Sequence, residues 1–332
     1  MQVAERCVAV GWWPERSRDV GSDGGAESLA LEYVFPSGRA AIAQSLEDAD
    51  LPAKGPIAVA GYSSDCLTRV VRRYGTPVDI CEADASAAVV YEQWGWPLTD
   101  TAWDELNERF RGRPMVLDRV DSADFFVQPR GGVEVLSLSK LLGLDGGGLA
   151  RANGCLVSFE PRPESDVMRR LRSRPLATLA GTGYRELFKE SRQAVHPAAL
   201  AWLHRNCLTR AVEDERSARQ RHLQLILDSR LAVGWPAWMR DVIGVGAGPV
   251  WAPVLRGQDA ARRWRAMSML EQRYGVVSAS RLFNWSGNPL RLDYEFCLAL
   301  PVHGGVTEFG GIVAALEYCL RRTRDAAADE SL

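Results

Sequence analysis

The sequence predicts an α/β protein in which a mostly parallel sheet forms a large domain and a smaller α+β domain follows. Short β-branched runs alternate with helical patterns over residues 31–205 and are joined by short connections. From about Leu231 the composition changes to Gly, Pro and Trp. We therefore expect an arm at 1–30, the large domain at 31–205, the small domain at 206–325 and a polar tail at 326–332.

The elements of the large domain are expected from their hydrophobic periods. Apolar residues at helical spacing follow a Ser37-Gly38 turn and predict a helix there. Further strands are expected at residues 57–60, 78–81, 87–91, 115–117 and 133–140, and helices at about 65–74 and 101–110. Because ligand sites in such sheets lie beyond the carboxyl ends of the strands, Asp118 and Lys140 are expected at one cleft.

The rest of the chain is more helical. A long helical region is expected over 184–229, interrupted at His196-Pro197. A last helix is expected at 307–322, with a frayed tail from Arg324. The other expected elements are strands at 154–159 and 250–255, an extended segment at 290–300, and helices at about 164–172 and 260–274.

Composition excludes several classes of protein. The chain has 332 residues, 46% hydrophobic and 25% charged, which is ordinary for a folded globular protein. A net charge of −2 argues against a general nucleic-acid surface. The seven cysteines form no CxxC pair and indicate reduced, mostly buried thiols in a cytoplasmic protein. No apolar run approaches the length of a membrane span, and the 11 tryptophans are expected to serve packing.

The run from Val133 to Gly148 carries the strongest signal of chemistry. An apolar, β-branched stretch ends in Ser137, Ser139 and Lys140, and a triple glycine follows at residues 146–148. A buried strand that delivers a lysine to a turn is suited to a Schiff-base lysine, because desolvation disfavours the charged amine. The same octapeptide is equally compatible with a solvated charge that closes a strand.

Other motifs are weaker or absent. The start of the helix after Ser37 has free backbone amides suited to an anion, although a simple serine cap explains it as well. GxGxxG, GxxxxGK[ST] and GxSxG patterns are absent. The four histidines lack metal-ligand spacing, so no metal site is expected.

Four pieces in order resemble the fold-type I pyridoxal-phosphate (PLP) enzymes, and most closely the DegT/DnrJ/EryC1/StrS aminotransferase family. They are the Ser37-Gly38-Arg39-Ala40-Ala41 stretch, Asp118, the Ser137-Leu138-Ser139-Lys140 stretch before the glycines, and the Cys297-Leu298-Ala299-Leu300-Pro301-Val302-His303 stretch before Thr307-Glu308. The resemblance spans about residues 31–322. Its last piece concerns domain packing rather than chemistry.

The resemblance implies roles for named residues. Lys140 is similar to the lysine that forms the internal aldimine and later moves a proton. Asp118 is similar to the carboxylate that pairs with the pyridine nitrogen and keeps the ring an electron sink. Gly38 and Arg39 match the turn that holds the cofactor phosphate, and Ser137 matches a hydroxyl that adds a phosphate hydrogen bond.

The chain also departs from the family pattern. Asp121 stands three residues after Asp118, where the family often has Gln or His, and a carboxylate beside the cofactor oxyanion would be unfavourable unless it turns away. Ser122 is an alternative for that contact. After Lys140 the glycines follow in a different pattern from the family's usual Gly-Glu-Gly-Gly. The segment after Asp84 is shorter than usual, by about 20 residues on the family pattern, which should remodel one wall of the cleft.

The aromatic residue that stacks on the ring is left open. Tyr62 is nearby in sequence, Ser64 or Asp65 matches the same place, and Trp94 is a further candidate. All four are retained as alternatives for that position.

The reaction implied is transfer of an amino group from a donor such as glutamate to a keto or aldehyde acceptor, for example a nucleotide-sugar or natural-product intermediate. A lyase, another PLP reaction, and a non-catalytic or regulatory relative are kept as alternatives. The family also implies a homodimer, with Gly183-Tyr184-Arg185 at the place of a partner-contributed loop. Arg281, Trp285, Arg291 and Trp94 are candidates to line the acceptor pocket.

Overall fold

The computed structural model describes residues 31–52, 54–81, 84–124, 132–144, 146–152, 155–160 and 195–329. The expected arm at 1–30, the helix at 164–172 and the loop at 183–185 lie outside the described residues. Two compact units make up the chain. Unit 1 comprises Met1–Glu92, Asp104–Asp121 and Phe125–Val212, and unit 2 comprises Gln93–Trp103, Ser122–Asp124 and Glu213–Leu332. The domain boundaries expected from sequence stay a prediction.

Unit 1 is built on a sheet with the strand order β2-β1-β3-β4-β5-β6-β7 in the described part of the chain. The strands β2, β1, β3, β4 and β5 are parallel, and β6 and β7 add in antiparallel fashion at one edge. The predicted mostly parallel sheet is therefore confirmed. The strands are β1 (Pro56–Val59), β2 (Thr76–Asp79), β3 (Ala87–Tyr91), β4 (Met115–Asp118), β5 (Val133–Ser137), β6 (Gly148–Ala152) and β7 (Cys155–Leu156).

The strand order reverses direction at β1. The chain moves from β1 outward to β2, and then returns to place β3 on the other side of β1. At such a reversal the loops beyond the carboxyl ends of neighbouring strands diverge and leave room for a ligand. The side chains that end β3, β4 and β5 are thus brought to one edge of the sheet.

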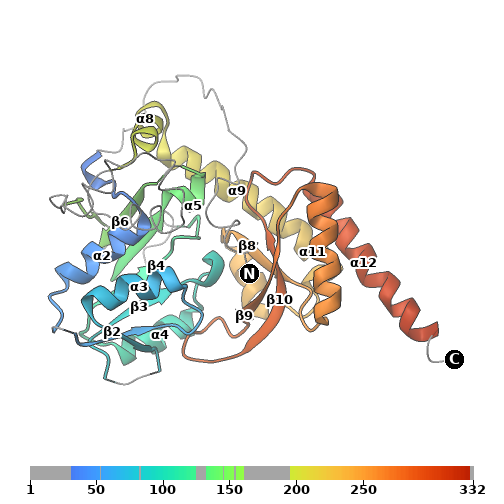
Figure 1. The fold of residues 1–332 in the computed structure, drawn as a ribbon, viewed down its shortest axis with the longest axis horizontal. Helices are drawn as coiled ribbons and strands as arrows, with labels where there is room; N and C mark the ends of the chain where they lie inside the picture. Colours follow the sequence, from blue (N-terminus) through green and yellow to red (C-terminus); the bar gives the residue numbers. More distant parts are fainter. Residues whose placement is uncertain are drawn as a thin grey trace, which may run out of the picture. The chain divides into compact units, whose positions relative to one another are not determined.

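Helices α2 (Gly38–Asp48) and α3 (Asp65–Tyr74) pack against each other, and α2 also packs against β4, β5 and β6 (Figure 1). Each begins at a serine that caps it, since Ser37 Oγ accepts from the Ala40 amide and Ser64 Oγ from the Leu67 amide. The other helices among the described residues of this unit are η1 (Leu31–Tyr33), α4 (Asp100–Arg109), α5 (Leu138–Leu142) and α8 (Pro197–Arg205). The division between the units falls within α4.

The core of unit 1 lies between α2, α3 and the sheet. Buried alanines of α2 allow the helix to approach the strands closely, and Ile42 and Leu46 fill the interface. Val70 and Val71 of α3 are buried in the same cluster, one helical face being apolar as its period predicts.

The strand expected over 133–140 is shorter than the sequence suggested. β5 ends at Ser137, and Lys140 lies in the short helix α5 rather than at a strand end. Leu138 and Leu141 are both buried, three residues apart, so this part of the apolar run has the helical period and the expectation of a continuous strand was wrong.

The strand expected at 154–159 is present only as the two-residue β7 (Cys155–Leu156), and β6 was not predicted. β6 begins at Gly148 and pairs with β5, and the short β7 follows. The glycines at 146 and 147 have φ of +118° and +89°, which turns the chain back onto β5 earlier than the apolar pattern indicated.

Unit 2 contains an antiparallel sheet in the order β8-β10-β9, formed by β8 (Trp251–Val254), β9 (Ala279–Asn284) and β10 (Tyr294–Pro301). Helix α11 contacts β9, β10 and α12 (Figure 1). Its helices are η2 (Gln93–Gly95), η4 (Arg230–Ala232), α10 (Ala237–Gly244), α11 (Ala260–Tyr274) and α12 (Phe309–Asp329); α9 (Leu208–Leu227) runs from unit 1 into unit 2.

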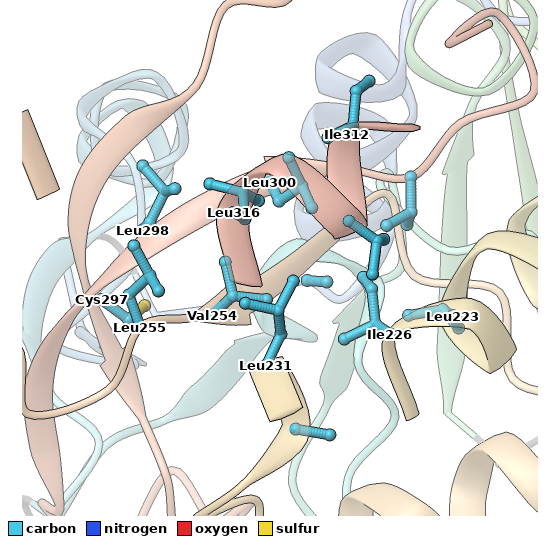
Figure 2. Packing of buried hydrophobic residues seen from close by; sticks show 14 of the residues in the cluster. Leu223, Ile226, Leu231, Val254, Leu255, Cys297, Leu298, Leu300, Ile312 and Leu316 are labelled. Atoms are coloured by element: carbon cyan, nitrogen blue, oxygen red, sulfur yellow. The ribbon is translucent and has the colours of Figure 1, made fainter. Parts of the chain in front are cut away.

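The core of unit 2 combines aliphatic and aromatic side chains in one cluster. Figure 2 shows Leu298 and Leu300 of β10 with Ile312 and Leu316 of α12, and all four are buried. The indole nitrogens donate inward: Trp96 to the Trp251 carbonyl at 2.8 Å, Trp235 to the Pro253 carbonyl at 2.7 Å, and Trp238 to the Trp285 carbonyl at 2.9 Å. These tryptophans serve packing, as expected from the sequence.

Several expectations for this half are corrected. α10 and β9 were not predicted, because their Trp-rich and short alternating segments have no clear period. The last helix continues to Asp329, so the tail expected to fray from Arg324 is helical as far as that residue. Among the described cysteines Cys297 is buried, whereas Cys81 and Cys155 are exposed, contrary to the expectation of mostly buried thiols.

The segment after β10 does serve packing. The Val302 amide donates to the Val250 carbonyl at 2.9 Å, and the Gly304 amide lies 3.1 Å from a carboxylate oxygen of Glu215. His222 stacks on Phe309 with ring centroids 4.1 Å apart. Among the described residues, no helix has both the length and the apolar character needed to span a membrane.

Candidate active site

A lysine, two aspartates and a tyrosine meet where the parallel strands of unit 1 end. Tyr91 is the last residue of β3, Asp118 the last of β4, and Lys140 lies just after β5. Lys140 Nζ is 3.3 Å from both Oδ1 and Oδ2 of Asp121. The Tyr91 hydroxyl donates a hydrogen bond to Asp121 Oδ2. Asp118 is close enough to act on Lys140 electrostatically, in agreement with the prediction. The direct contact of Lys140 is with Asp121, and this contact was not predicted.

The charged form of Lys140 is favoured in this arrangement. The protein that surrounds part of its side chain disfavours the ammonium, but the attraction of Asp121 and Asp118 outweighs that effect and raises the pKa of Lys140. The side chain keeps 42% of its surface exposed. Its environment is thus the reverse of the purely desolvated one expected from the apolar run.

Asp118 is nearly fully buried, with 5% of its surface exposed. Burial raises the pKa of Asp118 to about 7, against the opposing attraction of Lys140 and together with repulsion from Asp121 and Glu92. Its Oδ1 accepts from the Val120 amide at 3.2 Å, and within the described ranges no hydrogen bond reaches its other oxygen. The bond from the Val120 amide fixes the Asp118 carboxylate, so its Oδ2 is positioned to pair with a cation.

The start of α2 lies beside the end of β5. A Cβ added to Gly38 would lie 2.9 Å from Val120 Cγ1 and 3.2 Å from Ser137 Cβ, so only glycine permits this approach. Ser137 Oγ and Ser139 Oγ are 3.0 Å apart. The Ala40 amide is bonded to Ser37 Oγ, so the Gly38 amide and the Ser137 hydroxyl are the donors that we consider for an anion.

The triple glycine positions this helix start. The Gly147 amide donates to the Pro36 carbonyl at 2.8 Å, and Gly148 exchanges two backbone bonds of 2.9 Å with Phe35. A Cβ on Gly148 would lie 2.6 Å from the Gly38 nitrogen. The glycines therefore let the backbone before α2 approach β6 closely.

A buried chain of charges braces the same strands. Arg119 is 1% exposed and lies 3.1 Å from Glu92 Oε2 and 2.9 Å from Glu134 Oε1, while Arg151 lies 2.5 Å from Glu134 Oε2. Because Arg119 follows Asp118 directly and bridges β3 and β5, it fixes the carboxyl end of β4 between its neighbours.

The candidates for the stacking position lie in different places. The rings of Tyr62 and Tyr91 are 6.1 Å apart, so Tyr62 is next to the tyrosine that contacts Asp121. Ser64 caps α3 and Asp65 opens it. Trp94 belongs to unit 2, where its ring lies 5.0 Å from that of Phe283.

The other candidates are described by their own contacts. Ser122 belongs to unit 2, and its hydroxyl accepts from the Asp124 amide at 3.1 Å. Arg39 lies in the first turn of α2 and is partly buried. Trp285 is 1% exposed in the core of unit 2, with the Arg256 guanidinium 4.4 Å from its ring centre, so its ring is not open to an acceptor. Arg281 and Arg291 are exposed.

Sequence reasoning missed Tyr91 as a site residue. It was expected only as the end of a strand, although a polar residue at the carboxyl end of a parallel strand is itself a signal. For Lys140, a signal that sequence reasoning did not use was the rarity of lysine in the chain. The sequence contains three lysines, at 54, 140 and 189, and all other cationic side chains among its 40 Lys and Arg are arginines.

Comparison with known proteins bears on this geometry. Residues 26–159 match the model of a family described as "Putative PLP-dependent aminotransferase". The matched segment includes Ser37 to Arg39, Asp118, Asp121 and Lys140. No curated protein matches the chain.

Solved structures share the fold at low sequence identity. A DegT/DnrJ/EryC1/StrS aminotransferase from Brucella abortus is 17% identical, with a TM-score of 0.51 over 86% of this chain and 84% of that one. 3-Amino-5-hydroxybenzoic acid synthase is 14% identical, with a TM-score of 0.57 over 87% and 86%. The PLP form of a "Putative sugar aminotransferase" from Streptococcus pneumoniae is 13% identical, with a TM-score of 0.55 over 96% of each chain.

The solved structures confirm the predicted fold class, and the family match over residues 26–159 agrees with the predicted resemblance to PLP-dependent aminotransferases. The roles of individual residues remain predictions.

Proposed function

We propose that this chain, a PLP-dependent aminotransferase by family match and fold, passes an amino group from a donor amino acid to a keto or aldehyde acceptor at the edge of the unit 1 sheet. The observation that carries the proposal is the attraction between the Lys140 amine and the buried Asp118 carboxylate, in the same unit as the start of α2. A glutamate-like donor and an acceptor from a biosynthetic route are the substrates expected from the family resemblance.

The residues present fit the cofactor. Asp118 is buried, prefers a proton-sharing or cationic partner, and receives no hydrogen bond at one oxygen from the described residues. The amides at the start of α2 and the Ser137 hydroxyl offer donors for a phosphate. A partly exposed primary amine lies near the Asp118 carboxylate, whose pKa its charge lowers.

Bound PLP supplies an aldehyde for reversible attachment and a ring that accepts electrons from a substrate carbon. In this chain, Lys140 would supply the amine that holds the cofactor and moves a proton. Asp118 would pair with the ring nitrogen and keep it protonated. Gly38, Arg39 and Ser137 would hold the phosphate, and the burial of Asp118 would exclude water from its contact with the ring.

The test uses the small number of lysines. Wild-type protein incubated with PLP should show a visible absorbance that borohydride removes, and peptide mapping should then place the cofactor on Lys140. Lys140→Ala should abolish this absorbance, whereas the control Lys54→Ala, at an exposed position, should retain it. Cofactor found on another lysine, or on none, contradicts the proposal.

Transamination is separated from the alternatives by a spectral test. An excess of amino donors mixed with the loaded protein should convert the visible band completely, because the donor leaves its amino group on the cofactor. A loaded Lys140 that no amino donor converts would favour a lyase, another PLP reaction, or a non-catalytic relative. The contact between Lys140 and Asp121 is the observation that keeps these alternatives in view.

We also propose that the protein works as a cytoplasmic homodimer in a biosynthetic route. This rests on the family resemblance and on reduced cysteines, since the described cysteines are free thiols. Light scattering should give a dimer, and a fully active monomer would contradict this.

A further inference from the structure

Asp121 occupies a position that the sequence could not explain. From the sequence, a carboxylate beside the cofactor oxyanion would be unfavourable unless it turned away. In the structure both oxygens of Asp121 lie 3.3 Å from Lys140 Nζ, and the Tyr91 hydroxyl donates to Oδ2. Asp121 is itself 7% exposed, so its charge is held inside the protein by these two donors.

We propose that Asp121 is the positioning residue and proton partner of Lys140, and that it holds the ammonium of the cofactor-free chain and takes the proton that the amine loses before it reacts with an aldehyde. The role in the reaction rests on the proposed function, whereas the contact between Lys140 and Asp121 is present in the chain without cofactor. It assigns to Asp121 a role distinct from that of Asp118.

Geometry favours Asp121 over Asp118 as this partner. The nearest hydrogen bond of Asp118 is to the Val120 amide, whereas Asp121 meets Lys140 with both oxygens. A carboxylate with two oxygens equidistant from one ammonium can accept its proton without rearrangement. Tyr91 limits the rotation of this carboxylate by holding one oxygen.

The other groups that act on Lys140 come from several elements. Asp121 follows β4, Asp118 ends β4, and Cys66 lies in the first turn of α3. All three favour the charged amine, and the effect of Asp121 is the largest of these attractions. The raised pKa of Lys140 therefore agrees with its ion pair with Asp121.

The proposed step balances. The ammonium of Lys140 gives one proton to a carboxylate oxygen of Asp121, which leaves a neutral amine and a carboxylic acid. The nitrogen lone pair then forms a bond to the aldehyde carbon, and one water leaves as the carbon–nitrogen double bond forms. No oxidant or reductant takes part.

The experiment measures the amine directly in the cofactor-free full chain. A trace of an acylating reagent modifies only neutral amines, so the labelling rate of each lysine reports its neutral fraction at a given pH. Mass spectrometry separates the three lysines, and the exposed Lys54 serves as internal reference. The variants are Asp121→Asn, Asp121→Glu, Asp118→Asn and, as a matched control, Asp48→Asn at the exposed far end of α2.

In wild type Lys140 should be labelled more slowly than Lys54. Asp121→Asn should accelerate Lys140 about fivefold near neutral pH, a change equivalent to about 1 kcal/mol for a partly exposed ion pair. Asp121→Glu should restore slow labelling, Asp118→Asn should have a smaller effect, and Asp48→Asn none. Wild-type labelling of Lys140 should also quicken at about 1 M salt, where screening acts within a few ångströms.

Unchanged labelling in a folded Asp121→Asn protein, or a larger effect of Asp118→Asn, would overturn the proposal. The salt response of wild type decides the matter even when a variant fails to fold, because loss of an ion pair needs no substitution. Since labelling is measured without cofactor, a failure here is distinct from a failure of Lys140 to bind PLP.

Discussion

Replacing the buried Asp118 by asparagine should stabilise the cofactor-free chain, and more so as the pH rises. Asparagine keeps the shape and can still accept the Val120 amide, which lies 3.2 Å from Oδ1. The substitution removes a carboxyl group whose ionisation is disfavoured in the folded chain. The effect therefore depends on pH and not on packing.

The size of the effect follows from the pKa of Asp118. Its rise from 3.8 to about 7 corresponds to about 4 kcal/mol above pH 7, because a tenfold change in a protonation equilibrium is about 1.4 kcal/mol. Below 3.8 the residue is protonated in both states and contributes nothing. Between these values the unfolded chain ionises first, so wild type loses stability as pH rises. The gap between variant and wild type should be about 1.5 kcal/mol near pH 5 and about 4 kcal/mol near pH 8.

Urea unfolding at about pH 5 and pH 8, with hydrogen exchange of β4 and β5 to report on unit 1, measures this gap. Asp48→Asn, at an exposed position, should stay within about 0.5 kcal/mol of wild type at both pH values. An equal gap at the two pH values, or a less stable Asp118→Asn at the higher pH, would refute the reasoning. In the loaded enzyme the same substitution should retain cofactor and lose most turnover, since the ring nitrogen loses its charged partner.

Two further substitutions test the supports of the site. Arg119→Met should lower the free energy of unfolding in urea by about 3–5 kcal/mol, because it leaves two buried glutamates without their shared cation. A loss under about 1 kcal/mol would show that these ion pairs do not stabilise the strands. Gly148→Ala should cost about 1–3 kcal/mol or more and weaken PLP binding, because its Cβ would lie 2.6 Å from the Gly38 nitrogen. Gly310→Ala, in α12 with open space around it, should instead be neutral or stabilising by up to about 1 kcal/mol, and equal effects of the two glycine substitutions would contradict the steric argument.

Local rules in the sequence determined much of the fold. Helix α3 and strand β3 lie where their periods placed them, at Asp65–Tyr74 and Ala87–Tyr91, and α11 matches its expected range of 260–274. The serine before α2 caps it as expected. Lys140 and Asp118 could be singled out because each follows an apolar run, although only Asp118 ends a strand. These features depend on neighbours within a few positions, which is the range over which sequence patterns act.

Tertiary structure decided what those residues meet. Lys140 lies in the short helix α5, in which Leu138 and Leu141 are both buried. This helix packs against β6, so its formation depends on a neighbouring strand and not only on the apolar sequence from Val133 to Lys140. The partner of Lys140 is Asp121, 19 positions away, and the donor to Asp121 is Tyr91, 30 positions away. Such contacts follow from the order of β3, β4 and β5 in the sheet, and strand order is set by the packing of the whole unit rather than by any one segment.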